Sequence, residues 1–127
     1  MINVTEIAFT GYPVTDIVRA RAFYEGVLGL KTSATFAHEN RHWIEYDIGP
    51  ATLAITNMAP EWKPSNQGPS AALEVADFDA AVATLRAAKV PFVVEPTASP
   101  ACRLAVVSDP DGNSVAIHRR NSPAPHA

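Results

Sequence analysis

The sequence lacks three features that would place it in specific protein classes. Its single cysteine, Cys102, cannot form a disulfide within the chain, so we expect a reducing, cytoplasmic location. Ten Lys and Arg stand against 13 Asp and Glu, for a net charge of −3 without a basic stripe, which argues against a nucleic-acid partner. Long apolar runs are also missing, so we expect no membrane span and no secretory signal.

What is present is typical of a globular chain. It has 127 residues, of which 47% are hydrophobic and 18% charged. That length suits one domain with a sizeable core, which we place at 1–120. The remaining residues, 121–127, form a Pro- and Ala-rich stretch that we expect to be a flexible tail.

An internal repeat organises the chain. The segments "YPVTDIVRARAFYEGVLGL", 12–30, and "LEVADFDAAVATLRAAKVP", 73–91, both begin with a Val-x-Asp motif followed by apolar residues at helical spacing. Asp16 and Asp77 stand where a helix N-cap accepts a backbone N–H. We therefore expect one helix in each half, the first stopped by Gly29, with Lys89 at the equivalent position of the second.

Strand-like segments flank each helix, so each half reads β-α-β-β-β. The expected strands are 7–12, 32–37, 42–48 and 52–56 in the first module, and 71–75, 92–95, 103–107 and 114–118 in the second. Module one then spans about 5–56 and module two about 70–120, joined by a Pro-rich linker at 57–69. We predict an α+β fold in which the modules form a concave mixed sheet with the helices on its convex face, leaving the concave face for a ligand.

Three features together resemble the vicinal oxygen chelate superfamily: the repeat, the segment "FYEGVLGL" that closes the first helix, and the turn "DPDGN" before the last strand. Its members include glyoxalase I, extradiol dioxygenases and the fosfomycin- and bleomycin-resistance proteins. The resemblance covers about 5–119 and implies the fold. It does not single out one activity, because this fold carries isomerases, dioxygenases, transferases and simple binders.

The resemblance also implies four metal-ligand positions, one in the first and one in the last strand of each module. Here these positions carry Phe9, Ala54, Ser70 and Ala116. A divalent ion of this class needs several nitrogen or oxygen donors from the protein. We therefore expect neither a bound metal nor another cofactor.

Candidate chemistry lies in the last two expected strands of the second module, 103–107 and 114–118. His118 could act as a general base or as a hydrogen-bond donor, or simply end its strand at the rim of the sheet. Arg103 would face the ligand if Leu104 and Val106 face the core, and could then hold a carboxylate or phosphate. The alternative for Arg103 is an arginine paired at an edge.

Strand 42–48 can be read in two registers. If Ile44 and Tyr46 meet the helix, Trp43 and Glu45 line the ligand pocket, and Glu45 could serve as a base or bind a cation. In the opposite register the acidic residues are solvated. Phe9, Trp43 and Trp62 could form an apolar wall, with Trp62 either closing over the pocket or packing the linker down.

Three functions compete on these observations. We favour a metal-free binding protein for a small apolar or aromatic molecule, with the pocket lined by Phe9, Trp43, Glu45, Ala54, Trp62, Ser70, Arg103, Ala116 and His118. The alternative is a metal-free or relocated-metal enzyme of lyase, isomerase or dioxygenase type with His118 or Glu45 as base. A structural domain with a vestigial pocket is the third. Exposed sheet edges lead us to expect a homodimer.

Overall fold

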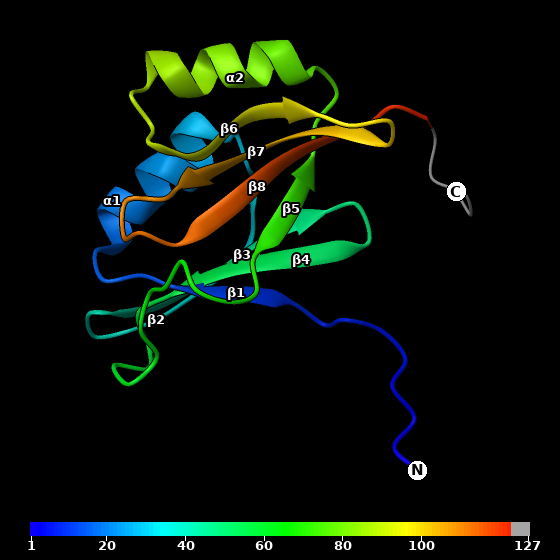
Figure 1. Ribbon diagram of the computed structural model, residues 1–127. Helices are drawn as coiled ribbons and strands as arrows, with labels where there is room; N and C mark the ends of the chain where they lie inside the picture. Colours follow the sequence, from blue (N-terminus) through cyan, green and yellow to red (C-terminus); the bar gives the residue numbers. More distant parts are fainter. Residues whose placement is uncertain (123–127) are drawn as a thin grey trace. The chain divides into compact units, whose positions relative to one another are not determined.

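A computed structural model describes residues 1–122 and divides the chain into two compact units, Met1–Pro64 and Ser65–Ala127 (Figure 1). The boundary falls inside the segment expected to be a linker. The tail expected at 121–127 lies almost wholly outside the described residues. Within those residues, no helix is both long and apolar enough to cross a bilayer.

The first unit is a four-stranded mixed sheet with one irregular helix. Its elements are β1 (Thr10–Pro13), α1 (Ile17–Arg21), η1 (Ala22–Val27), β2 (Thr32–His38), β3 (Arg41–Ile48) and β4 (Ala51–Thr56). The strand order is β1-β4-β3-β2, in which β1 runs parallel to β4 and the other pairs are antiparallel. The helix therefore serves as the crossover connection of a β-α-β-β-β module.

The helix begins and ends where local chemistry predicts. The Asp16 carboxylate accepts the Arg19 N–H at 3.1 Å as N-cap. After α1 the helix widens into the π-helical η1, and Gly29, at φ 74°, ends it in the left-handed conformation that glycine adopts readily.

The helix packs on its own sheet through buried tyrosines. Tyr24 is fully buried, and its ring centroid lies 6.0 Å from that of Tyr12 and 6.4 Å from that of Tyr46. The Tyr46 hydroxyl donates to Glu25 at 2.8 Å, and Arg21 pairs with the same carboxylate at 2.7 Å. Burial raises the pKa of Glu25, but the hydrogen bonds from Arg21 and Tyr46 outweigh it and hold the pKa below its usual value.

The second unit repeats this plan. It comprises β5 (Ala71–Glu74), α2 (Phe78–Ala87), β6 (Phe92–Ala98), β7 (Cys102–Ser108) and β8 (Ser114–Arg120), with strand order β5-β8-β7-β6 and β5 parallel to β8. Two four-stranded mixed sheets with two helices confirm the α+β class and the repeated β-α-β-β-β module.

Two local features of the second unit follow from its sequence. Asp77 caps α2 by accepting the Ala80 N–H at 3.0 Å, and Lys89, at φ 59°, takes the place of the missing glycine. In the turn "DPDGN", Asp109 accepts the backbone N–H groups of Asp111 and Asn113 at 2.9 and 2.8 Å. Asn113 also donates its side-chain amide to Asp109 at 2.9 Å, so a closed Asx turn leads into β8.

Strand boundaries differ from the sequence-based ones mainly at the ends. The first strand begins at Thr10 and not at Ile7, whose side chain is 79% exposed. The apolar character of Ile7 therefore does not reflect a place in the sheet. The last strand of each unit pairs along its full length with its antiparallel neighbour, which extends β8 to Arg120.

Candidate functional site

The register of β3 decides which side chains of the first unit are available to a ligand. Ile44 and Tyr46 lie on the helix-covered face, at 1% and 0% exposure. Trp43 and Glu45 alternate with them and therefore lie on the opposite, helix-free face. Of the two registers open from the sequence, the structure has the one that frees Trp43 and Glu45.

Three aromatic side chains, Phe9, Trp43 and Trp62, gather on this helix-free face. Phe9 and Trp43 meet edge to face, with ring centroids 5.0 Å apart. Gly11 lies between Phe9 and Trp62: a Cβ atom added there would lie 2.6 Å from Cη2 of Trp62 and 3.4 Å from Cε2 of Phe9. We call Phe9, Trp43 and Trp62 the aromatic cluster. Phe9 remains 45% exposed and Trp62 39%, so the cluster presents apolar surface to solvent.

A carboxylate stands at the edge of the aromatic cluster. The Trp43 indole N–H donates to Glu45 at 2.8 Å, which fixes both side chains on the helix-free face. The arrangement combines aromatic rings with one anionic group, which is the chemistry that recognises an aromatic molecule carrying a positive charge. Ala54, the direct partner of both Gly11 and Glu45, forms the fully buried floor between them.

Sequence reasoning missed two residues of this face. Gly11 is the position over which Trp62 lies, and a lone glycine inside a strand is itself a signal of close approach. Phe36 pairs directly with Trp43 across β2 and β3 and is 60% exposed, so it extends the apolar surface. The sequence could have placed Phe36 beside Trp43 only if the pairing register of the β2–β3 hairpin had been known.

The second unit places His118 and Ala116 on the helix-free face of its own sheet, opposite to Val115 and Ile117, which are buried at 0% and 2% exposure. His118 is part-buried, and its Nδ1 lies 2.6 Å from the Glu74 carboxylate on neighbouring β5. Glu74 is a further residue that the sequence did not single out, because the pair depends on the parallel register of β5 and β8.

The Glu74 carboxylate decides which proton His118 carries. Partial burial raises the pKa of Glu74, but hydrogen bonds from the Arg120 backbone N–H and from His118 outweigh it and hold the pKa below its usual value. An ionised carboxylate only accepts, so the Nδ1 of His118 donates and, in the neutral ring, Nε2 is left as an acceptor.

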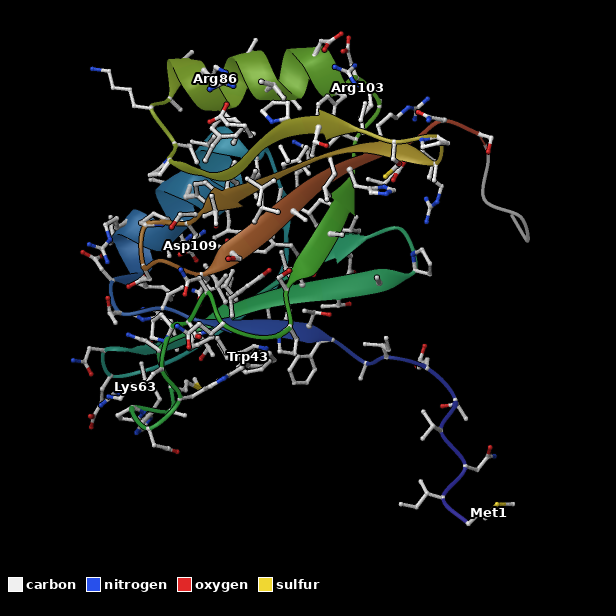
Figure 2. All side chains as sticks on the ribbon, viewed as in Figure 1. Met1, Trp43, Lys63, Arg86, Arg103 and Asp109 are labelled. Atoms are coloured by element: carbon white, nitrogen blue, oxygen red, sulfur yellow. The ribbon has the colours of Figure 1, made fainter. Side chains whose placement is uncertain are left out.

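Arg103 lies on the other side of its sheet from the one expected. Its guanidinium pairs with Asp79 at 2.7 Å and lies 4.4 Å from the centroid of the Phe78 ring, both on α2 (Figure 2). Ala105 and Val107, which share its face, are fully buried. The expectation that Leu104 and Val106 face the core was wrong: the helix covers the face of Arg103, Ala105 and Val107, and Arg103 caps its edge.

The four positions implied as metal ligands offer almost no donor atoms. Phe9 is an aromatic ring in edge-to-face contact with Trp43, and the side chains of Ala54 and Ala116 are methyl groups, at residue exposures of 0% and 7%. Ser70 supplies one hydroxyl from an exposed position just before β5. Within residues 1–122, no three His, Cys, Asp or Glu side chains come together in a way that could hold a metal ion. The residues present therefore do not fit a divalent metal at these positions.

The chain matches a protein-family model over most of its length. The family model for the Glyoxalase/Bleomycin resistance protein/Dioxygenase superfamily matches residues 6–117. Comparison with curated proteins gave no match.

Solved structures similar to this chain share its fold along nearly its whole length. TnmS3, described as an antibiotic binding protein from Streptomyces sp. CB03234, is 24% identical with a TM-score of 0.78, covering 95% of this chain and 100% of its own. A glyoxalase/bleomycin resistance protein from the same organism is 26% identical with a TM-score of 0.72, covering 88% and 98%. A superfamily member from Sphaerobacter thermophilus DSM 20745 is 24% identical with a TM-score of 0.71, covering 92% and 98%.

Proposed function

We propose that this chain binds a small aromatic molecule without a metal ion. The chain belongs to the Glyoxalase/Bleomycin resistance protein/Dioxygenase superfamily. The binding surface is the helix-free face of the first unit, built on the aromatic cluster. Sequestration of the molecule, with no chemical change to it, is the activity that this surface supports best.

The observation that carries the proposal is the exposed aromatic cluster. Phe9 and Trp62 keep 45% and 39% of their surface exposed although both contact neighbouring rings or strand β1. Phe9 and Trp43 fix each other by edge-to-face contact, and Trp62 lies against Gly11. Rings that are already fixed need little further ordering when a flat molecule stacks on them, so less conformational free energy is lost on binding. A surface of this kind is typical of binding sites for aromatic ligands.

Two further observations support binding over metal chemistry. Phe9, Ala54, Ser70 and Ala116 occupy the positions that the family resemblance implies for metal ligands, so we infer that these ligands have been lost. TnmS3, an antibiotic binding protein, has the same fold, which is consistent with a small-molecule binder on this scaffold.

Glu45 gives the proposed site a preference among aromatic molecules. Its carboxylate is held beside the rings by the 2.8 Å hydrogen bond from Trp43. A planar aromatic cation gains both stacking and charge attraction there, whereas a neutral analogue gains only the stacking. We therefore expect the natural ligand to carry an amine or another cationic group.

Calorimetric titration with 9-aminoacridine, a planar cation, and acridine, neutral at pH 8, tests both parts of the proposal. We expect both to bind and 9-aminoacridine to bind more tightly. Glu45→Gln should weaken 9-aminoacridine about threefold to tenfold and leave acridine unchanged. Asp47→Asn, two residues along the same strand, changes the net charge equally and should have little effect. Absence of binding by both compounds would refute the proposed function.

We also propose a homodimer in the cytoplasm. Each sheet ends in an edge strand, β2 or β6, with exposed apolar side chains: Phe36 at 60%, Val93 at 52% and Val94 at 41%. Exposed edges of this kind favour pairing with a second copy. A lone thiol, Cys102, suits a reducing compartment.

A second candidate function rests on the 2.6 Å contact between Glu74 and His118. With Nδ1 held by the carboxylate, Nε2 of the neutral ring can accept a proton, as a metal-free enzyme that abstracts a proton next to a carbonyl requires. Deuterium exchange of dihydroxyacetone in D2O, followed by proton NMR with a chelator present, tests this. Exchange faster than in buffer, and lost in His118→Gln, would support the candidate; equal rates in protein and buffer would exclude that activity on this probe.

A further inference from the structure

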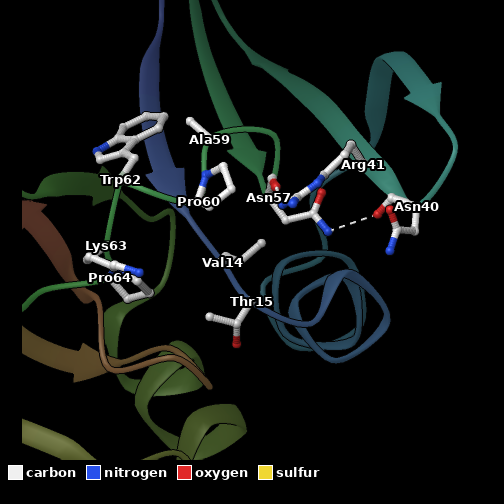
Figure 3. A pocket seen from close by; sticks show the side chains of 10 residues that line it. All are labelled: Val14, Thr15, Asn40, Arg41, Asn57, Ala59, Pro60, Trp62, Lys63 and Pro64. Carbon is white, nitrogen blue, oxygen red and sulfur yellow. Dashed lines mark hydrogen bonds between the residues drawn. The ribbon is translucent and has the colours of Figure 1, made fainter.

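A cavity of about 340 Å³ opens in the first unit beyond the end of β1 (Figure 3). Lys63 stands on one side of it, and Arg41, Asn40 and Asn57 stand on the other, with Val14 and Thr15 between. The volume is in the range of small-molecule sites. Apart from Trp62, whose side chain also reaches over Gly11, none of its residues belongs to the aromatic cluster.

The charge of this cavity is opposite to that of the chain as a whole. Two cations, Arg41 and Lys63, line it, and no carboxylate is among the lining residues of the described chain, although the net charge of the protein is −3. Elsewhere, arginines are neutralised: Arg21, Arg86 and Arg103 each have a carboxylate 2.7 Å away. Within residues 1–122, neither Arg41 nor Lys63 forms an ion pair.

Arg41 is held in position for a ligand. Its Nη1 donates to the Asn57 carbonyl at 2.8 Å, which leaves the remaining N–H groups of the guanidinium available. Asn57 in turn accepts the His42 N–H at 2.7 Å and donates to the Asn40 carbonyl at 3.1 Å. Asn57 therefore ties the turn between β2 and β3 to the end of β4, and Arg41 is fixed with it.

Lys63 and the apolar side chain of Val14 provide the remaining contacts for a ligand in this cavity. In the described chain the Lys63 ammonium makes no hydrogen bond, so its three donors are open. Its segment is held by the Trp62 N–H, which donates to the Ala59 carbonyl at 3.0 Å, and by Pro60 and Pro64 on either side. Val14, 4% exposed, lies between the two cations as an apolar base.

We propose that this cavity binds a small organic oxyanion, a carboxylate or a phosphate monoester with an apolar body. The planar fork of Arg41 matches two oxygens of either group, and Lys63 adds a point charge from the opposite side. The apolar body lies on Val14 and Trp62. This site shares Trp62 with the proposed aromatic-cation site, but its two cations, Arg41 and Lys63, are not part of that site. The proposal therefore stands whether or not the aromatic-cation site binds its ligand.

NMR titration at low salt with benzoate, phenyl phosphate and the neutral isostere benzamide tests the proposal on the full chain. Benzoate or phenyl phosphate should give saturable shifts in the side-chain amide signals of Asn40 and Asn57, and benzamide should give none. Whichever anion binds more tightly identifies the head group. Lys63→Gln should weaken binding about tenfold, the effect of losing one charged hydrogen bond.

One further site variant, Arg41→Gln, and one control variant, Lys31→Gln, complete the test. Arg41→Gln should weaken binding at least as much, but it also removes the hydrogen bond to Asn57 and can unfold the turn. Lys63→Gln breaks no hydrogen bond among residues 1–122 and is therefore the deciding variant. Lys31→Gln removes the same charge from an exposed position outside the cavity and should leave binding unchanged. Equal weakening by Lys31→Gln and Lys63→Gln, equal shifts with benzamide, or no saturable shift at Asn40 and Asn57 would overturn the proposal.

Discussion

Replacing Gly11 with alanine is expected to move Trp62 away from strand β1. The new Cβ would lie 2.6 Å from Cη2 of Trp62, whereas carbon atoms in contact sit about 3.5–4.0 Å apart. The indole must therefore retreat by about 1 Å. Trp62 is the group that gives way, because it is 39% exposed and lies outside the sheet.

The effects of Gly11→Ala on stability and on binding should differ. Alanine is favoured over glycine inside a strand by roughly 0.5–1 kcal/mol, and this offsets a strain of about 1 kcal/mol at the low end of overpacking costs. The melting temperature should therefore change little. A displaced Trp62 loses an aromatic contact worth about 0.5–1.5 kcal/mol to a stacked ligand, so the Kd for 9-aminoacridine should rise about twofold to tenfold.

Calorimetric titration and thermal unfolding measure the two effects on the same sample. Gly26→Ala is the matched control, because among the described residues no atom lies within 4 Å of a Cβ added there. That variant should gain about 0.5–1 kcal/mol of stability in η1 and bind as the parent does. If Gly11→Ala binds 9-aminoacridine as tightly as the parent while the Trp62 indole signal has shifted, Trp62 plays no part in binding and the proposed site is wrong.

Four other predictions address the core, the assembly and metal content. Phe23→Ala should lower stability by about 3–5 kcal/mol, because Phe23 is 4% exposed, whereas Phe9→Ala should lower it far less; equal losses in the two melting curves would mean that Phe9 belongs to the core. Tyr46→Phe should cost about 1.5–3 kcal/mol near neutral pH by removing the hydrogen bond to ionised Glu25. Because the pKa of Glu25 is lowered from 4.5 in the folded state, the stabilisation by its ionised carboxylate is present above that value and is lost as the pH falls through the folded pKa. The deficit of Tyr46→Phe in denaturant titrations should therefore shrink in acid, and a constant deficit would argue against this hydrogen bond to an ionised carboxylate. Light scattering should give about twice 13.6 kDa; a monomer mass at micromolar concentration would exclude the dimer. Elemental analysis of protein purified without chelator should find no stoichiometric transition metal, and one equivalent per chain would contradict the inferred loss of ligands.

Local features of the fold could be predicted from the sequence because they depend on neighbouring residues. The caps at Asp16 and Asp77, the left-handed stop at Gly29 and the Asx turn at Asp109 each involve residues within a few positions of one another. The repeat of these signals was enough to predict two modules of the same topology.

Strand register could not be predicted where both faces carry similar side chains. In the strand that begins at Arg103, both faces are apolar: Leu104 and Val106 alternate with Ala105 and Val107. Hydrophobicity alone therefore did not favour one face. Contacts with Asp79 and Phe78, 24 and 25 positions earlier in the chain, place Arg103 beside the helix.

The candidate site depends on contacts of the same long range. Trp62 meets Gly11 only because the segment after β4 returns over β1, and Glu74 meets His118 only through a parallel pairing. The lone glycine at position 11 signals a close approach but does not say which residue makes it, and no local pattern around Glu74 points to His118.

Two-dimensional NMR of the indole N–H groups tests the central claim most directly. The chain has two tryptophans, Trp43 and Trp62, and both belong to the aromatic cluster, so every indole signal reports on the proposed site. We predict that 9-aminoacridine shifts both signals to saturation at one molecule per chain, with the same Kd before and after treatment with a chelator. Unshifted indole signals, or shifts that require an added metal ion, would contradict metal-free binding of an aromatic molecule on this face.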